Sequence, residues 1–256
     1  MNYYKIEQFD NTGLVKTFCV YKDQARWRIY SYNEKANMED LKYYRELADD
    51  FHITIDDMIR IPQTHSDNVL VADKKYAGSG VVYKELEEGT DGIITNEKRL
   101  MLLTIESDCT PVFILDTKNK AIAMVHSGWR GAVNKITEKA IEKMIQNYGT
   151  DKNDLMIHFG PSICGNCYEV EYDLVDEFKK ILNDDEINLV FKKHIEKKDK
   201  LLLDVTEVIR LSLLKYGIDE KNMTRTNICT YHSGLFHSWR KEKDKTKQML
   251  TGIMLV

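Results

Sequence analysis

The sequence predicts a single domain of the α+β class. Its apolar residues fall into many short runs, each bounded by polar, Gly or Pro residues, and this pattern is typical of short strands. Fewer segments carry apolar residues at spacings of three and four, which indicates helices packed along one face. Neither an internal repeat nor a linker divides the 256 residues, so we expect one domain over residues 1–256 with a substantial core.

The first part of the chain is expected to hold several strands and one helix. The helix extends from Met38 to Phe51 and places Leu41, Tyr44 and Leu47 on one face. Residues 73–89 are polar and irregular. The strands are expected at Gly13–Val20, Arg26–Tyr32, Met58–Ile61, Thr90–Asn96 and Met101–Ile105.

A hairpin is predicted at the centre of the chain. The apolar runs Pro111–Leu115 and Ala121–Val125 flank a turn-rich segment, Asp116 to Lys120. A turn centred on Thr117 and Lys118 would place Cys109 opposite His126 at the open end, with Cβ atoms roughly 5 Å apart. A shift of one or two residues would keep the two side chains neighbours, although on different faces.

The second half is expected to alternate helices and strands. Helices are predicted at Val133–Tyr148, Leu174–Leu182 and Val205–Tyr216, the last opened by Asp204 and Glu207 in a capping-box-like pair. Residues 183–200 are charged and read as an exposed connection. Strands are expected at Leu155–Phe159, Asn227–Thr230, Leu235–Trp239 and Met249–Leu255.

Three residues at strand ends form a candidate site. His65 follows a predicted strand, and Cys109 and His126 stand at the open end of the hairpin, where sites tend to form. A thiolate and two imidazoles suit a catalytic zinc ion, which keeps a fourth position open. Cys109 and His126 alone would suit a nucleophile and its base. The spacing of these residues leaves both readings open.

Cys164 and Cys167 form the other motif of interest, a CxxC. A structural metal site there would need further ligands, and the sequence shows no second pair. Cys19 and Cys229 are isolated in strand-like runs and are expected to be small core residues.

Composition excludes several classes of protein. The 37 basic and 41 acidic residues give a net charge of −4, which does not indicate a nucleic-acid or anionic-membrane partner. No apolar stretch approaches the roughly 18 residues of a membrane span. The N-terminal residues lack a signal-peptide core, and the five cysteines are an odd number, so we expect reduced thiols and a soluble, cytoplasmic protein, with a monomer the expected state. Neither a GxxxxGK[ST] nor a GxGxxG motif is present.

From about Met58 onward the chain resembles the multifunctional purine nucleoside phosphorylase family, also called the YfiH or laccase-domain family. The matching motifs occur in the family's order. They are Gln63-x-His65 with Val69, Thr90-Asp91-Gly92-Ile93, Asp108-Cys109-x-Pro111-Val112, His126-x-Gly128-Trp129-Arg130-Gly131, Gly160-Pro161-x-Ile163, Cys167-Tyr168-Glu169-Val170, Cys229-Thr230 and Phe236-x-Ser238-x-Arg240.

This resemblance implies a layered α/β/β/α sandwich and a Zn²⁺ cofactor bound by His65, Cys109 and His126. It implies phosphorolysis of adenosine, inosine and methylthioadenosine, and hydrolytic deamination of adenosine, with a purine nucleoside and phosphate as partners. Asp108 is the candidate to carry a proton in deamination. Arg130 and the start of the helix that follows are candidates to hold phosphate. Arg240 and Gln63 are the expected substrate contacts, and Lys241 is a further phosphate candidate.

The chain departs from the family pattern in two places. The family's N-terminal TR-GG-S loop is not found in residues 17–33, and its C-terminal TGR is replaced by Thr246-Lys247-Gln248. Substrate preference and phosphate binding are therefore the parts of the resemblance with the least support.

Other functions stay open beside the zinc enzyme. One is a metal-free cysteine hydrolase or amidase that uses Cys109 and His126. Another is an accessory or editing protein with a structural zinc ion. Multicopper oxidation is disfavoured, because none of the seven histidines forms a His-x-His pair.

Overall fold

Six strands form the largest sheet of the computed structural model, which describes residues 1–25, 38–82, 86, 89–243 and 247–256. Their spatial order is β13-β9-β7-β8-β5-β4, and the central pairs β9–β7, β7–β8 and β8–β5 are antiparallel. The strands are β4 (Asn68–Val71), β5 (Thr90–Thr95), β7 (Thr110–Asp116), β8 (Ala121–Ser127), β9 (Leu155–Phe159) and β13 (Met223–Arg225). Every residue of β5, β7 and β8 is buried, because the sheet is covered on both faces.

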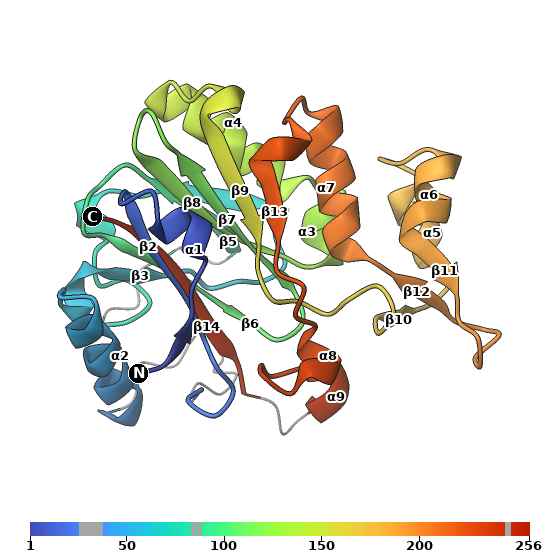
Figure 1. Cartoon of the computed structure of the whole chain (residues 1–256), viewed down its shortest axis with the longest axis horizontal. Helices are drawn as coiled ribbons and strands as arrows, with labels where there is room; N and C mark the ends of the chain where they lie inside the picture. The colour runs from blue at the N-terminus through green and yellow to red at the C-terminus, as the bar shows by residue number, and fades with distance from the viewer. Residues whose placement is uncertain (26–37, 83–85, 87–88, 244–246) are drawn as a thin grey trace.

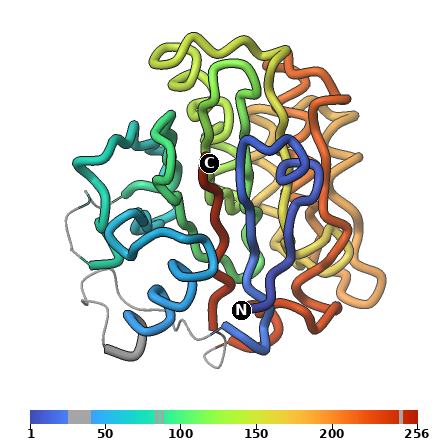
Figure 2. The backbone as a smooth tube through the Cα atoms, turned by 60° about the vertical axis from the view of Figure 1, so that its left-hand side comes forward, coloured from blue at the N-terminus to red at the C-terminus, as the bar shows by residue number. Residues whose placement is uncertain are grey.

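A second sheet of five strands lies against the first. Its order is β1-β2-β14-β6-β3, so the C-terminal strand β14 occupies the middle, between β2 and β6 (Figure 2). The strands are β1 (Tyr3–Tyr4), β2 (Val15–Val20), β3 (Met58–Arg60), β6 (Met101–Glu106) and β14 (Met249–Leu255).

Three separate apolar clusters show the order of the layers. Phe113 and Met124 of the large sheet share one cluster with Leu102 and Ile253 of the small sheet, and this cluster fills the space between the sheets. The opposite face of the large sheet packs on α4 (Ile136–Tyr148) and α7 (Val205–Lys215). The outer face of the five-stranded sheet packs on α2 (Met38–Asp50). Figure 1 shows α4 and α2 on opposite sides of the paired sheets, so the predicted α/β/β/α sandwich is confirmed.

A smaller unit projects beside the sandwich, at the right of Figure 1. It contains the sheet β10-β12-β11 and two short helices. The elements are β10 (Glu169–Val170), α5 (Leu174–Phe178), α6 (Asp184–Val190), β11 (Phe191–Lys193) and β12 (Leu201–Leu203). The prediction that residues 183–200 form only an exposed connection is wrong, because Ile187 and Val190 are buried in the core cluster and Asn183 with Glu186 forms a capping box that starts α6.

Two strands expected near the C-terminus are helices or loops instead. The segments Asn227–Thr230 and Leu235–Trp239 lead into α8 (Thr230–Ser233) and α9 (Trp239–Glu242). The strand that precedes both segments is β13. Apolar runs of four or five residues do not distinguish a strand from an irregular buried segment, which explains the error. The expected strand Arg26–Tyr32 lies outside the described residues.

Two predicted helices are shorter than expected. The helix expected from Val133 divides into α3 (Trp129–Val133) and α4, because Lys135 has a left-handed backbone with φ of 58°. The helix expected from Leu174 to Leu182 ends at Phe178. The remaining helical segments are α1 (Glu7–Asp10) and the 3₁₀ turns Ile55–Asp57, Lys74–Tyr76, Lys152–Asp154 and Glu220–Asn222. None of the helices in the described part of the chain has the length and apolar character that a bilayer crossing requires.

The central hairpin has a different register from the predicted one. Pro111, rather than Cys109, stands opposite His126. The turn is longer than assumed because Asp116 accepts hydrogen bonds from the backbone N–H groups of Lys118 and Asn119, at 3.0 and 2.9 Å. Cys109 therefore lies just before β7, at the mouth of the hairpin.

Candidate metal centre

Three segments that are far apart in the sequence bring His65, Cys109 and His126 together. His65 lies in the loop between β3 and β4, Cys109 precedes β7, and His126 is near the end of β8. One ligand atom from each side chain lies within 4.8 Å of the other two, and His65 Nε2 is 3.8 Å from Cys109 Sγ. Donors bound tetrahedrally to one zinc ion lie roughly 3.5–3.8 Å apart. The three side chains are thus close enough together for one metal ion to bind all three.

The backbone around the centre adopts conformations that non-glycine residues seldom take. Gln63, His65 and Asp108 have φ angles of 51°, 61° and 91°. Such conformations cost on the order of 1–3 kcal/mol each and persist only where the surrounding structure holds them. At Asp108 the unusual backbone bends the chain before β7, which brings the Cys109 side chain to the mouth of the hairpin.

A buried carboxylate, Asp91 of β5, connects two of the candidate ligands. Its Oδ1 lies 2.8 Å from Nδ1 of His126 and accepts a hydrogen bond of 3.0 Å from the backbone N–H of His65. Its Oδ2 accepts from the backbone N–H groups of Thr64 and Ser66, at 3.0 and 2.7 Å. Burial opposes ionisation of Asp91, but the bonds to His126 and Ser66 outweigh it and lower its pKa. The charged carboxylate holds the His126 ring by its Nδ1 side, which leaves Nε2 to face the other two candidate ligands and to bind a metal ion once that nitrogen is deprotonated.

Gly128 leaves the space in which a metal would lie. A Cβ atom at this position would be 3.0 Å from Cys109 Sγ and 3.1 Å from the His65 ring, although the φ of −80° suits any residue. The absence of a side chain is therefore required by the closeness of the ligands and not by the backbone conformation.

Cys109 and His126 influence the charge of one another. Burial opposes ionisation of the Cys109 thiol, but the adjoining His126 and the hydrogen bonds to both histidines outweigh burial and lower its pKa to about 6. Burial likewise opposes protonation of His126, but the charge of Cys109 and the hydrogen bond to Asp91 overcome it and raise its pKa. A thiolate is therefore the favoured form of Cys109 at neutral pH, which is the form that binds metal ions or acts as a nucleophile.

The three side chains line a cavity of about 530 Å³. Trp129, Tyr168 and Trp239 give it aromatic walls, and Arg60, Arg130 and Arg240 give it positive charge. The guanidinium of Arg130 lies over the ring of Trp129, 4.2 Å from its centroid, and that of Arg240 lies over Tyr168 at 4.7 Å. Its volume is within the range of small-molecule sites.

The remaining predicted residues occupy different positions around this cavity. Asp108 lines it and accepts hydrogen bonds from Thr230 Oγ1 and the Arg240 backbone N–H, at 2.6 and 2.7 Å. Gln63 lines it too, but its amide bonds both backbone groups of Ile105, each at 2.7 Å. Lys241 is not among the residues that line it and lies over the ring of Tyr231, 5.9 Å from the centroid.

Sequence reasoning assigned no role to Asp91, Arg60 or Tyr168. Asp91 belongs to the motif Thr90-Asp91-Gly92-Ile93, and an acidic residue inside a predicted strand was the signal available. Tyr168 also belongs to one of the matching motifs, Cys167-Tyr168-Glu169-Val170, whereas Arg60 reaches the cavity from the end of β3, where no local pattern marks it.

The fold and the site define a family. A family model described as "Multi-copper polyphenol oxidoreductase laccase" matches residues 29–256, and the chain belongs to this family. The resemblance noted in the sequence is thereby confirmed.

Among curated relatives, the chain is similar to the purine nucleoside phosphorylase YlmD of Bacillus subtilis, with 28% identity over 209 residues that span 81% of this chain and 74% of the relative. It is 33% identical to a purine nucleoside phosphorylase of Bacteroides thetaiotaomicron over 75% of this chain and 71% of the relative. It is 29% identical to the adenosine deaminase RL5 of an unknown prokaryotic organism, over 76% of this chain and 74% of the relative.

Solved structures share the fold. The hypothetical protein YfiH of Bacillus licheniformis matches with a TM-score of 0.85 at 23% identity, covering 98% of this chain and 96% of that one. YlmD of Geobacillus stearothermophilus matches with a TM-score of 0.80 at 21% identity, covering 94% and 92%.

Proposed function

We propose that this protein is a zinc-dependent purine nucleoside enzyme that catalyses phosphorolysis of adenosine, inosine and methylthioadenosine and hydrolytic deamination of adenosine. The observation that carries the proposal is the convergence of His65, Cys109 and His126 at one wall of an aromatic, positively charged cavity. Similarity to relatives named for purine nucleoside phosphorolysis and adenosine deamination supports it.

Zinc fits these residues on three grounds. The donor set is one thiolate and two imidazoles, Asp91 fixes the tautomer of His126, and Gly128 leaves room between the ligands. A zinc ion with three protein ligands supplies a Lewis acid and lowers the pKa of water to about 7.

The purine base is expected to lie against the aromatic walls. Trp129 and Tyr168 are each stacked with an arginine, which holds their rings in position. Aromatic faces of this kind bind flat heterocycles through offset stacking. Exclusion of water from this wall would strengthen the polar contacts made to the substrate.

Phosphate is expected to bind through the arginines and not through a helix. The helix expected after His126 is only the short α3, so its dipole is small. A guanidinium stacked on an aromatic ring keeps its N–H edge available for bidentate contact with phosphate. Both Arg130 and Arg240 are stacked in this way. Nη1 of Arg240 donates to the Glu169 carbonyl at 2.6 Å, so its other N–H groups are the ones left for phosphate. Arg60 extends the positive wall.

Asp108 is our candidate to carry a proton in deamination. Its carboxylate is held by Thr230 and by the backbone of Arg240, and it lies directly before Cys109. A carboxylate fixed beside the metal ligands can transfer a proton to the leaving amino group. Gln63 stays a predicted substrate contact, with a second task of holding the end of β6.

The test combines metal analysis with turnover. Protein purified without added metal is expected to contain zinc, to release base from adenosine and inosine only with phosphate, and to release ammonia from adenosine. Cys109→Ala is expected to lose the zinc of this centre. Both activities are expected to fall by at least about 100-fold. Cys19→Ala is the matched control, because Cys19 is buried between the two sheets. Full activity in Cys109→Ala would refute the proposal.

The metal-free cysteine hydrolase is the second candidate, because the closeness of Cys109 to His65 and His126 and the lowered pKa of its thiol suit a nucleophile as well as a metal ligand. Such a protein would lack metal at this centre, and an electrophile would label Cys109 with loss of activity. An accessory protein would bind metal without nucleoside turnover. The same samples therefore separate all three functions.

A further inference from the structure

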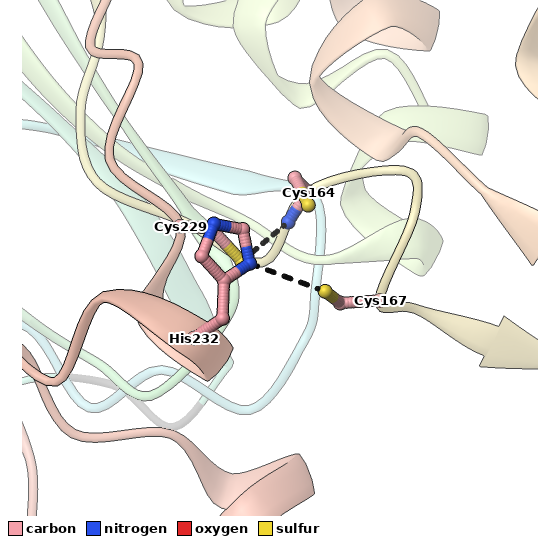
Figure 3. Close-up of side chains that lie close together, drawn as sticks. All are labelled: Cys164, Cys167, Cys229 and His232. Atoms are coloured by element: carbon pink, nitrogen blue, oxygen red, sulfur yellow. Dashed lines mark hydrogen bonds between the residues drawn. The ribbon is translucent and has the colours of Figure 1, made fainter.

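A second group of metal-binding side chains lies outside the centre described above. Cys164 and Cys167 come from the loop after β9, and Cys229 and His232 come from the start of α8 (Figure 3). Their ligand atoms all lie within 4.8 Å of one another. His232 Nδ1 is 3.4 Å from Cys167 Sγ, close to the roughly 3.5 Å between a nitrogen and a sulfur on one tetrahedral zinc ion.

We propose that the chain binds a second, structural zinc ion through the four side chains of this group: Cys164, Cys167, Cys229 and His232. The missing partners of the CxxC motif are thus Cys229 and His232. Cys229 is buried, as expected from the sequence, but it is not a simple core residue, because its sulfur lies in this group. The proposal does not depend on the proposed function.

The identity of the ion follows from the donors. Three thiolates and one imidazole are a typical ligand set of a structural zinc site. Four protein ligands fill the tetrahedral coordination of zinc and leave no open position for water or substrate. Oxygen-preferring ions such as Mg²⁺ and Ca²⁺ are disfavoured by this set.

The backbone is already shaped for the ion. The CxxC segment turns tightly, with the N–H groups of Cys167 and Tyr168 bonded to the Cys164 carbonyl at 2.9 and 3.2 Å. The backbone N–H of Cys164 donates to the sulfur of Cys229, at 3.3 Å. Hydrogen bonds of this kind stabilise a thiolate ligand. Gly165 allows the turn to lie against α7, because a Cβ there would be 2.6 Å from that of Asp204.

The two ligand-bearing segments are also joined beside the ion. Ser162 and Cys229 form an isolated parallel bridge, and the Thr230 N–H donates to the Ser162 carbonyl at 3.1 Å. These contacts place the four ligands together before metal binds, so binding does not require a large rearrangement.

The site would stabilise one wall of the candidate active cavity. Ile163, directly before Cys164, donates through its backbone to the Asp108 carbonyl at 3.0 Å, and Thr230, directly after Cys229, donates to the Asp108 side chain. Tyr168, directly after Cys167, lines the cavity and supports Arg240. A metal that joins the two segments therefore holds Asp108 and Tyr168 in position.

The first experiment is metal analysis of the full chain purified without added metal. The wild type is expected to contain about two zinc ions per chain, and Cys109→Ala and the double variant Cys164→Ser with Cys167→Ser about one each. Cobalt(II) replacing zinc gives a thiolate-to-cobalt absorption that grows with the number of thiolate ligands. This absorption is expected to be stronger in Cys109→Ala, whose remaining site has three thiolate ligands, than in the double variant, whose remaining site has one.

A second set of variants avoids reliance on a protein that fails to fold. His232 is exposed on α8, so His232→Ala removes one ligand with little loss of packing. It is expected to lower zinc content and to reduce the melting temperature by about 5 °C or more. His232→Cys should restore both, because a fourth thiolate also binds zinc tetrahedrally. His52→Asn, at an exposed histidine of the opposite layer, is the control and should change neither.

The outcomes separate this site from the first one. Zinc that persists in Cys109→Ala and disappears in the double variant supports the second site, even where the proposed function fails. About one zinc per chain that Cys109→Ala removes completely would overturn the proposal. A disulfide within the CxxC in protein kept under reducing conditions would overturn it as well.

Discussion

The Asp91 carboxylate lies 2.8 Å from Nδ1 of His126, and the same carboxylate accepts the backbone N–H groups of Thr64, His65 and Ser66. One buried side chain therefore sets the orientation of His126 and shapes the loop that presents His65. Because β5 lies beside β8 in the sheet, this carboxylate is within hydrogen-bonding distance of His126 and of the loop that carries His65.

Replacing Asp91 by Asn should weaken metal binding about 10- to 100-fold, since the amide lacks the charge that orients His126. Zinc affinity measured by competition with a coloured chelator checks this, with Cys109→Ala protein as the blank for zinc bound elsewhere. Asp116→Asn is the matched control, because Asp116 is also fully buried and bonds a backbone turn at the opposite end of the hairpin. Equal losses in the two variants would contradict the role given to Asp91.

Gly128→Ala should reduce zinc at the first centre although its backbone conformation suits alanine. The added methyl group would lie 3.0 Å from Cys109 Sγ, in the space between the ligands. Metal content and the melting temperature are the measurements. In Gly131→Ala, the control, the methyl group meets the Ile136 side chain at 3.1 Å rather than the side chain of a candidate ligand, and should leave the metal in place. A Gly128→Ala protein with undiminished zinc affinity would show that the metal does not lie there.

Arg130→Ala should affect the two proposed reactions differently. Loss of a charge-assisted contact costs about 1.5–3 kcal/mol, so the KM for phosphate should rise roughly 10- to 100-fold. Deamination of adenosine uses no phosphate and should fall much less. Steady-state kinetics with phosphate and adenosine varied in turn provide the measurement, and Arg45→Ala, an exposed arginine on α2, is the control. An equal fall in both reactions would assign Arg130 a structural role.

The buried His158 should make the fold sensitive to acid. Burial lowers its pKa from 6.5 to about 4, and its ring nitrogens lie 2.8 Å from the hydroxyls of Thr224 and Thr226. Between these pH values the unfolded chain binds more protons than the folded one. The stabilisation is complete above pH 6.5 and is lost as the pH falls toward 4, by about 3 kcal/mol.

Denaturant unfolding of the wild type and His158→Gln at several pH values measures this effect. The free energy of unfolding of the variant should depend less on pH between 6.5 and 4, because glutamine does not titrate. Any acid release of metal acts on both proteins, so the difference between them reports His158 alone. Parallel pH profiles would be evidence against a neutral buried imidazole.

Local patterns predicted the hairpin and the strand ends that carry His65, Cys109 and His126. Apolar runs bounded by turn residues identify β7 and β8 because burial on both faces leaves few polar positions. The observed register of the hairpin differs from the predicted one, because the side chain of Asp116 closes a longer turn than the one assumed. Cys109 lies at the open end of the hairpin as predicted, but Pro111 rather than Cys109 stands opposite His126.

The second cysteine group shows what local patterns do not reveal. Cys164 and Cys167 form a visible pair, whereas Cys229 and His232 stand more than sixty residues away, with Cys167 and His232 separated by 65 positions. They meet because β9 and β13 are parallel neighbours, so the segments that follow both strands emerge at the same edge of the sheet. A strand was expected at Asn227–Thr230, and this error concealed the helix start that presents His232.

The sequence by itself determined the class of fold, the central hairpin and the identity of three candidate zinc ligands, because periodicity and strand-end chemistry are local properties. The tertiary structure alone decided which side chains complete each site. Asp91, Arg60 and Tyr168 join the first centre, and Cys229 and His232 join the second, only through strand pairing and loop contacts between distant segments. Such contacts depend on which strands become neighbours in each sheet, and the order of the strands is a property of the whole chain.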